Sequence, residues 1–96
     1  MQGYGLDILI NDYHYIVRRK IVKLCYRLDK LINDPNFFVR MEVAKQKYGL
    51  DILINDPDYH VRICVAREGY ELNKLINDPD KYVRDTVIRY CERHKD

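Results

Sequence analysis

A unit of 22 residues occurs four times in this chain and limits its fold more than any other feature. The copies span residues 4–25, 26–47, 48–69 and 70–91. A tyrosine begins each copy, at Tyr4, Tyr26, Tyr48 and Tyr70. Because such short repeats stack on their neighbours, we expect one repeat domain over residues 1–96, with a polar C-terminal tail at 92–96.

The pattern within one copy predicts two helices. In the third copy, apolar residues spaced three and four apart predict a short helix from Leu50 to about Asn55. Pro57 ends that helix, because proline disfavours a helical conformation in the residue before it. We expect Asp56 to cap a second helix, with Pro57 as its first residue, that runs to about Glu68.

Neither helix is long enough to close a hydrophobic core, because they measure only about 9 Å and about 16 Å. Gly69 follows the longer helix and is expected to end it in a left-handed conformation. The copies must therefore stack. The sequence predicts an all-α fold, a short α-solenoid (superhelix) of four two-helix repeats. The first helix of each repeat is short, and either α-helical or 3-10.

The repeated unit L-x-x-L-I-N-D-P-x-x-x-V-R resembles HEAT-like repeats. Its length is similar to that of the leucine-rich repeat variant family, in which an α-helix alternates with a short 3-10-like one, although 22 residues is a little short for that family. The first copy departs from the unit because Tyr13 replaces the proline. One member of that family holds an iron–sulfur centre with a cysteine cluster that has no counterpart here, so we expect no cofactor.

An arginine lies inside the apolar arc of the longer helix in every copy. On a wheel with the valine column (Val17, Val39, Val61 and Val83) at 0°, the arginine lies at about 100°, between apolar columns at about 40° and 140°. A charge placed there is expected to be paired, and the aspartates of the turn, in the same or the adjacent copy, are its best partners. The predicted structural ladder is Arg18, Arg40, Arg62, Arg84, Asp12, Asp34, Asp56 and Asp78. A phosphate-binding role would instead need the arginines on the open face.

The side of the wheel opposite the core carries a stripe that is basic and largely aromatic. Its two columns lie at about 240° and 260°, while a third column, at about 160°, borders the buried arc. The candidate binding residues from these columns are Lys23, Phe38, Lys45, Tyr59, His60, Arg67, Tyr82 and Arg89. Two interpretations stay open: a solvated face with side chains lying along it, or a surface that recognises an acidic or extended peptide.

Charge is unevenly distributed along the chain, whose net charge is only +2. Residues 4–47 hold nine basic and five acidic side chains, and residues 48–96 hold eight and ten, which gives +4 and −2. This asymmetry would direct an acidic partner to the first half, or favour head-to-tail self-association. Only three residues precede the first copy, so its end lacks a polar cap and is a predicted contact surface, or a place where further repeats precede. We expect residues 92–96 to cover the other end better.

Chemistry beyond binding finds little support in the composition. The chain has no serine, and Cys64 with His60 four residues earlier is an expected incidental pair on an outer helical face. The three histidines belong to different parts of the array, so no metal site is expected. The odd number of cysteines, Cys25, Cys64 and Cys91, suggests reduced thiols and a cytoplasmic protein.

These observations favour a non-enzymatic scaffold module that binds a protein or peptide through the basic and aromatic face, with an acidic patch as the favoured target. The alternative is a nucleic-acid-associated protein that uses the same basic stripe. Self-association through the uncapped N-terminal end is a further expectation. No stretch of the sequence has the length and apolar character of a membrane span, so no membrane partner is expected.

Overall fold

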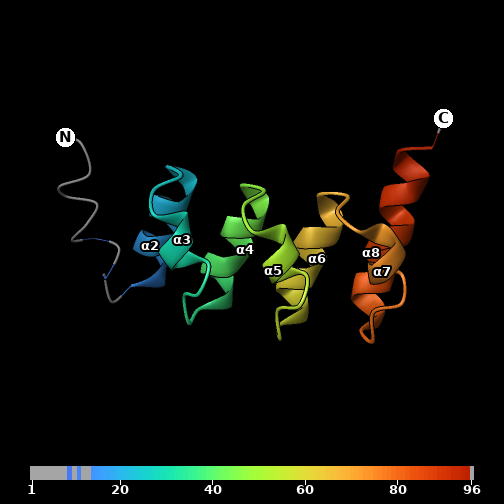
Figure 1. Cartoon of the computed structure of the whole chain (residues 1–96), viewed down its shortest axis with the longest axis horizontal. Helices are drawn as coiled ribbons and strands as arrows, with labels where there is room; N and C mark the ends of the chain where they lie inside the picture. Colours follow the sequence, from blue (N-terminus) through green and yellow to red (C-terminus); the bar gives the residue numbers. More distant parts are fainter. Residues whose placement is uncertain (1–8, 10, 12–13, 96) are drawn as a thin grey trace.

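The computed structural model describes residues 9, 11 and 14–95, and this part of the chain is all-α, with no strand. Within these residues, four longer helices alternate with three helices of four residues each (Figure 1). The longer ones are α2 (Tyr15–Lys23), α4 (Phe37–Lys45), α6 (Tyr59–Arg67) and α8 (Lys81–Arg93). The short ones are α3 (Leu28–Leu31), α5 (Leu50–Leu53) and α7 (Leu72–Leu75). Tyr4, Asp12 and the short helix expected in the first copy lie outside the described residues.

The helices follow one another along a molecule of 45 × 27 × 19 Å. Each longer helix packs against the next longer one, α2 on α4, α4 on α6 and α6 on α8. The short helices lie together on one side of this row, in front of the longer helices in Figure 1. Each element therefore contacts mainly elements that are close to it in the sequence.

The longer helices begin two residues later than the Asp-Pro pattern predicts. The N-cap of α6 is Asp58, in an extended conformation, and its side chain accepts a hydrogen bond from the His60 backbone N–H at 2.8 Å. The expectation that Asp56 caps this helix is wrong. Its carboxylate instead accepts the backbone N–H of Asp58 at 2.9 Å and holds the turn before the helix. Asn36 and Asp80 are the corresponding caps of α4 and α8.

Helix α6 ends where the sequence predicts, and the short helices are α-helical. Gly69 has a φ of 75°, which confirms the expected left-handed stop after α6. A Cβ added at this residue would meet the hydroxyl end of Tyr90, so a larger residue would also require that side chain to move. In α5 the Leu53 N–H donates to the Gly49 carbonyl four residues back, while the Ile52 N–H and the turn after the helix make 3-10-type bonds.

The core runs along the interface between the two kinds of helix. The predicted apolar columns supply most of it: Ile21, Val22, Val39, Val43, Ala44, Val61, Val65, Ala66, Val83 and Val87 are all at most 2% exposed. A column that the wheel analysis left outside is also buried, through Glu42, Cys64 and Thr86. Each longer helix packs between two others, so its buried arc is wider than one apolar stripe. Helix α8 extends into the predicted tail, so that Glu92 and Arg93 are helical.

Candidate binding surface

Three arginines of the predicted ladder each join one copy to the next. Arg62 of α6 reaches forward to Asp78, with its Nε 2.8 Å from Oδ2 and its Nη2 3.2 Å from Oδ1. Its Nη1 donates to the Asp56 carbonyl of its own copy at 2.7 Å. The Arg62 and Asp78 side chains are only 14% and 6% exposed. A bidentate pair at this depth is a structural contact, because both oxygens of the carboxylate are already bonded to the guanidinium.

The same arrangement occurs at the two earlier junctions. Arg18 pairs with Asp34, with Nε 2.6 Å from Oδ2, and Arg40 pairs with Asp56 at 2.8 Å. Asp12, the first aspartate of the ladder, lies outside the described residues. Arg84 donates to the Asp78 carbonyl at 2.7 Å, but no following copy offers it a carboxylate within the described part of the chain.

Aromatic rings form one continuous row across the N-terminal ends of the longer helices. Neighbouring rings stack at centroid distances between 4.1 and 6.1 Å. The members, in spatial order, are His14, Tyr15, Phe38, Phe37, His60, Tyr59 and Tyr82. The wheel assigned these rings, apart from His14, to two separate columns. The contacts cross from one helix to the next: Tyr15 of α2 stacks on Phe38 of α4, Phe37 of α4 on His60 of α6, and Tyr59 of α6 on Tyr82 of α8.

In α8 a lysine replaces the first of the two adjacent aromatic residues. Lys81 occupies the place that an aromatic residue holds in the other copies, and its Nζ lies 5.9 Å from the centroid of the Tyr82 ring. The ammonium group also lies 3.5 Å from the carboxylate of Asp85. Near the middle of the row, the Nδ1 of His60 lies 3.0 Å from the Oδ1 of Asp58, which orients the imidazole.

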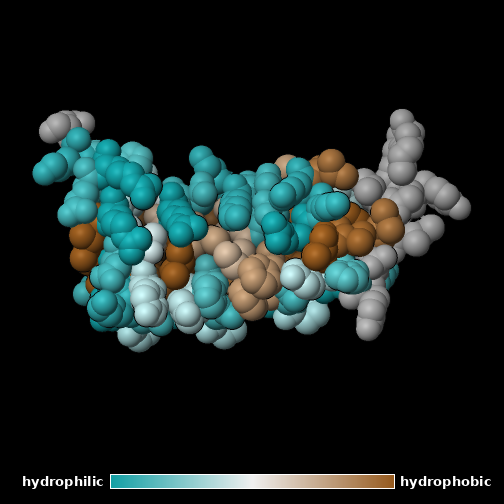
Figure 2. Space-filling model, turned by 180° about the vertical axis from the view of Figure 1, so that it is seen from behind, coloured by the Kyte–Doolittle hydropathy of each residue, from teal (hydrophilic) through white to brown (hydrophobic). Residues whose placement is uncertain are grey.

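The basic column lies on the same side, nearer the C-terminal ends of the longer helices. All four of its members, Lys23, Lys45, Arg67 and Arg89, are exposed. Figure 2 shows the face opposite the short helices. A hydrophilic band runs along one edge of this face, with paler and apolar residues beside it. Three of the cations lie in the last turn of their helices, where they also complement the helix dipole.

The two features meet in an open groove of about 350 Å³ between α6 and α8. Its lining residues are Tyr59, His60, Ile63, Arg67, Tyr82, Thr86 and Arg89. Five of these are candidate residues from the sequence, whereas Lys23, Phe38 and Lys45 lie on earlier helices. Arg67 and Arg89 also border a second hollow of about 170 Å³, together with Arg93 and His94. Sequence reasoning missed these last two, because it treated residues after 91 as a tail.

Cys64 does not lie on the outer face, so its expected position beside His60 there is wrong. It is 1% exposed within the core. Burial raises the pKa of the Cys64 thiol, which keeps the group protonated and poorly nucleophilic. Among residues 9, 11 and 14–95, no group of three or more His, Cys, Asp or Glu side chains is arranged to hold a metal ion.

Comparisons with known proteins do not assign this chain to a family. Models of known protein families, curated protein sequences and solved structures all lack a significant match to this chain. Within the described residues, no helix has both the length and the apolar character needed to cross a membrane. The surface described above is therefore the main basis for a functional proposal.

Proposed function

We propose that this chain is a HEAT-like, leucine-rich-repeat-variant-like α-solenoid whose four copies build one non-enzymatic binding module. The 22-residue spacing of α2, α4, α6 and α8 supports the arrangement. So does the recurrence of the same forward Arg–Asp pair at successive junctions. Such a module presents side chains from several copies on one continuous face, which suits an extended ligand.

The module binds an acidic, extended peptide segment of a partner protein. The observation that carries this proposal is the groove between α6 and α8, which combines stacked rings with Arg67 and Arg89. Flat rings provide contact area for the apolar parts of a peptide, and the arginines attract its carboxylates. The row of rings continues across α4 and α2, so that an extended ligand could cross several copies.

A nucleic-acid ligand is the second candidate, because the same face offers cations beside stacking rings. Single-stranded nucleic acid would place its bases on the rings and its phosphates against the basic column. We favour the peptide because the rings already stack on one another and leave mainly their edges and the exposed Phe38 and Tyr82 for contact. A cytoplasmic location fits the three free thiols.

The proposal is tested by fluorescence anisotropy with a labelled peptide of alternating glutamate and proline. Proline keeps this probe extended and can pack on aromatic rings. We expect Arg67→Ala with Arg89→Ala to weaken its binding at least about tenfold, equivalent to about 1.4 kcal/mol. Both side chains are exposed, so the double variant should keep its fold.

The matched control removes the same charge from the other side of the molecule. Lys30→Ala with Lys74→Ala alters two exposed residues on α3 and α7, which should leave peptide affinity within about twofold. An equal loss of peptide affinity in both double variants would show that net charge alone accounts for the effect. That result would contradict the proposed groove. Tight binding of oligothymidine with a steep salt dependence, without peptide binding, would favour the nucleic-acid alternative.

A further inference from the structure

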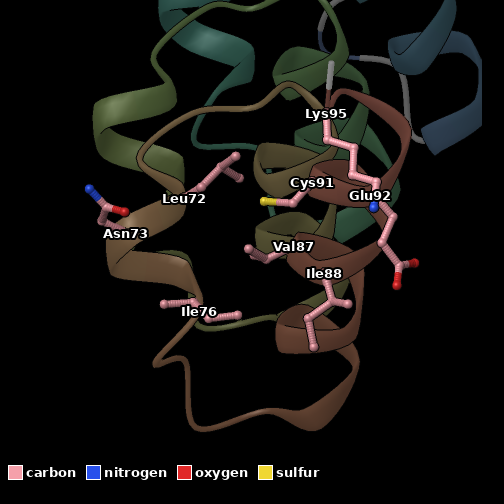
Figure 3. A pocket seen from close by; sticks show the side chains of 8 residues that line it. All are labelled: Leu72, Asn73, Ile76, Val87, Ile88, Cys91, Glu92 and Lys95. Atoms are coloured by element: carbon pink, nitrogen blue, oxygen red, sulfur yellow. The ribbon is translucent and has the colours of Figure 1, made fainter.

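The C-terminal end of the molecule carries an apolar hollow of about 450 Å³ between α7 and α8. Figure 3 shows the side chains of Leu72, Val87 and Cys91 directed into the gap between the two helices. Ile76 and Ile88 complete the apolar lining. Asn73, Glu92 and Lys95 add polar groups around it. Glu92 and Lys95 of the predicted tail border the hollow but leave its apolar floor open.

The equivalent positions in earlier copies are covered by the copy that follows. Ile88 is 47% exposed, whereas Val22, Ala44 and Ala66 at the same position are 0% exposed. Ile76 is half-buried, whereas Ile32 is only 5% exposed. The neighbour that covers Ile32 is Gly49 of the next copy, whose Cβ, if present, would lie 2.3 Å from the Ile32 Cδ1. The hollow is thus the surface on which a further repeat would stack.

The hydrogen bonds of Arg84 independently indicate that a repeat would occupy this end. Its Nη1 donates to the carbonyl of Asp78 in its own copy at 2.7 Å, as Arg62 does to Asp56. In Arg62 the Nε and Nη2 edge of the guanidinium holds the aspartate of the next copy. The corresponding edge of Arg84 lacks a carboxylate in the described part of the chain. A partner for this end therefore needs an aspartate at the turn of a two-helix repeat.

We propose that a second copy of this chain occupies the C-terminal end, stacking its first repeat on α7 and α8. Asp12 of the second copy would pair with Arg84, and its Leu9 and Ile10 would pack toward Ile88. The first repeat has the required sequence, because it carries the Leu-Ile-Asn-Asp run of the other copies. Residues 70–96 carry no net charge, with six basic and six acidic side chains, so the complementary charge at this contact is the Arg84 guanidinium against the Asp12 carboxylate.

This contact joins two different surfaces of the same molecule. A heterologous contact of this kind leaves one free end on each side, so it produces a growing series of oligomers unless the chain closes into a ring. Sedimentation velocity over a range of concentrations tests it directly. We expect masses that are multiples of the 11.6 kDa monomer and that increase with concentration.

Two variants block opposite ends of the contact. Ile88→Lys places a charge over the hollow, and Asp12→Lys reverses the charge of the residue expected to meet Arg84. Each variant alone should be monomeric, with a dissociation constant at least about tenfold higher than the wild type. Mixed in equal amounts, the two variants should form a one-to-one dimer and nothing larger, because the mixture has one intact head and one intact tail.

The control is Ile52→Lys, which adds the same charge at a 58% exposed isoleucine of α5, away from the end. It should oligomerise like the wild type. A wild-type chain that stays monomeric at all concentrations would overturn the proposal, as would oligomers that persist in Ile88→Lys. A dimer that Ile88→Lys abolishes but Asp12→Lys does not would indicate a symmetric tail-to-tail contact, and would overturn it equally. Circular dichroism of each variant verifies that it is folded.

Discussion

The junction between the third and fourth copies and the C-terminal end are built from the same residue types and differ in what covers them. At the junction, Arg62 holds a buried aspartate and Ala66 is fully buried. At the end, Arg84 donates to a backbone carbonyl and meets no carboxylate among the described residues, and Ile88 is half exposed. The comparison teaches that a repeat motif specifies half of a contact, and that the adjacent copy supplies the other half.

The largest expected effect is at the buried ion pair. Arg62→Ala should lower the free energy of unfolding by about 3–5 kcal/mol, because it leaves the Asp78 carboxylate buried without its cation. Arg84→Ala should lower it by only about 1 kcal/mol, because it removes one hydrogen bond to a carbonyl. Urea denaturation, at concentrations too low for association, measures both. Equal losses would show that the two arginines have equivalent surroundings.

A smaller difference is expected for packing. Val65→Ala should lower the free energy of unfolding by about 2 kcal/mol, since it removes two methyl groups from a fully buried side chain. Ile88→Ala removes more atoms but should cost less than about 1 kcal/mol, because 47% of this side chain is exposed. Thermal unfolding followed by circular dichroism ranks the two variants. A larger loss of stability for Ile88→Ala than for Val65→Ala would mean that the C-terminal end is already covered in the monomer.

The smallest expected effect is a pH dependence that separates two thiols. Burial raises the pKa of Cys64 above its usual value, so the folded chain keeps a proton that the unfolded chain loses above about pH 9.0. Stability should therefore fall as pH rises above this value, by at most about 1.4 kcal/mol per pH unit from one proton. Cys64→Ala should flatten this slope in urea denaturation from pH 8 to 10.

Cys91 provides the control for that prediction, because it is exposed at the C-terminal hollow. Cys91→Ala should leave the alkaline slope unchanged. A thiol reagent offers a second measurement on the unmodified chain. The exposed Cys25 and Cys91 should react at once, and Cys64 only on unfolding. Rapid reaction of all three thiols in the native state would contradict the burial of Cys64.

Part of the candidate surface was accessible to sequence reasoning, and the reason is periodicity. The helical wheel places Lys45 and Arg67 on the exposed side because their position relative to the core column depends only on helix geometry. It could not join Phe37 to His60, since their contact at 5.1 Å crosses from one copy to the next. It also left Cys64 outside the core, because this column holds a lysine, a glutamate and a threonine in the other copies and so looks polar.

The sequence by itself determined the local order along the chain. The alternation of short and longer helices, the left-handed stop at Gly69 and the arginine in each apolar arc follow from contacts within about one turn of helix. The tertiary structure alone decided the cap at Asp58, the forward direction of the Arg62 pair and the burial of Cys64. The last two depend on which groups from a neighbouring element surround the residue. The cap at Asp58 accompanies a turn in which Asp56 is held by Arg40 of the preceding copy. The exposed end at Ile88 belongs with them, because exposure is a property of what is stacked on a helix and not of the helix itself.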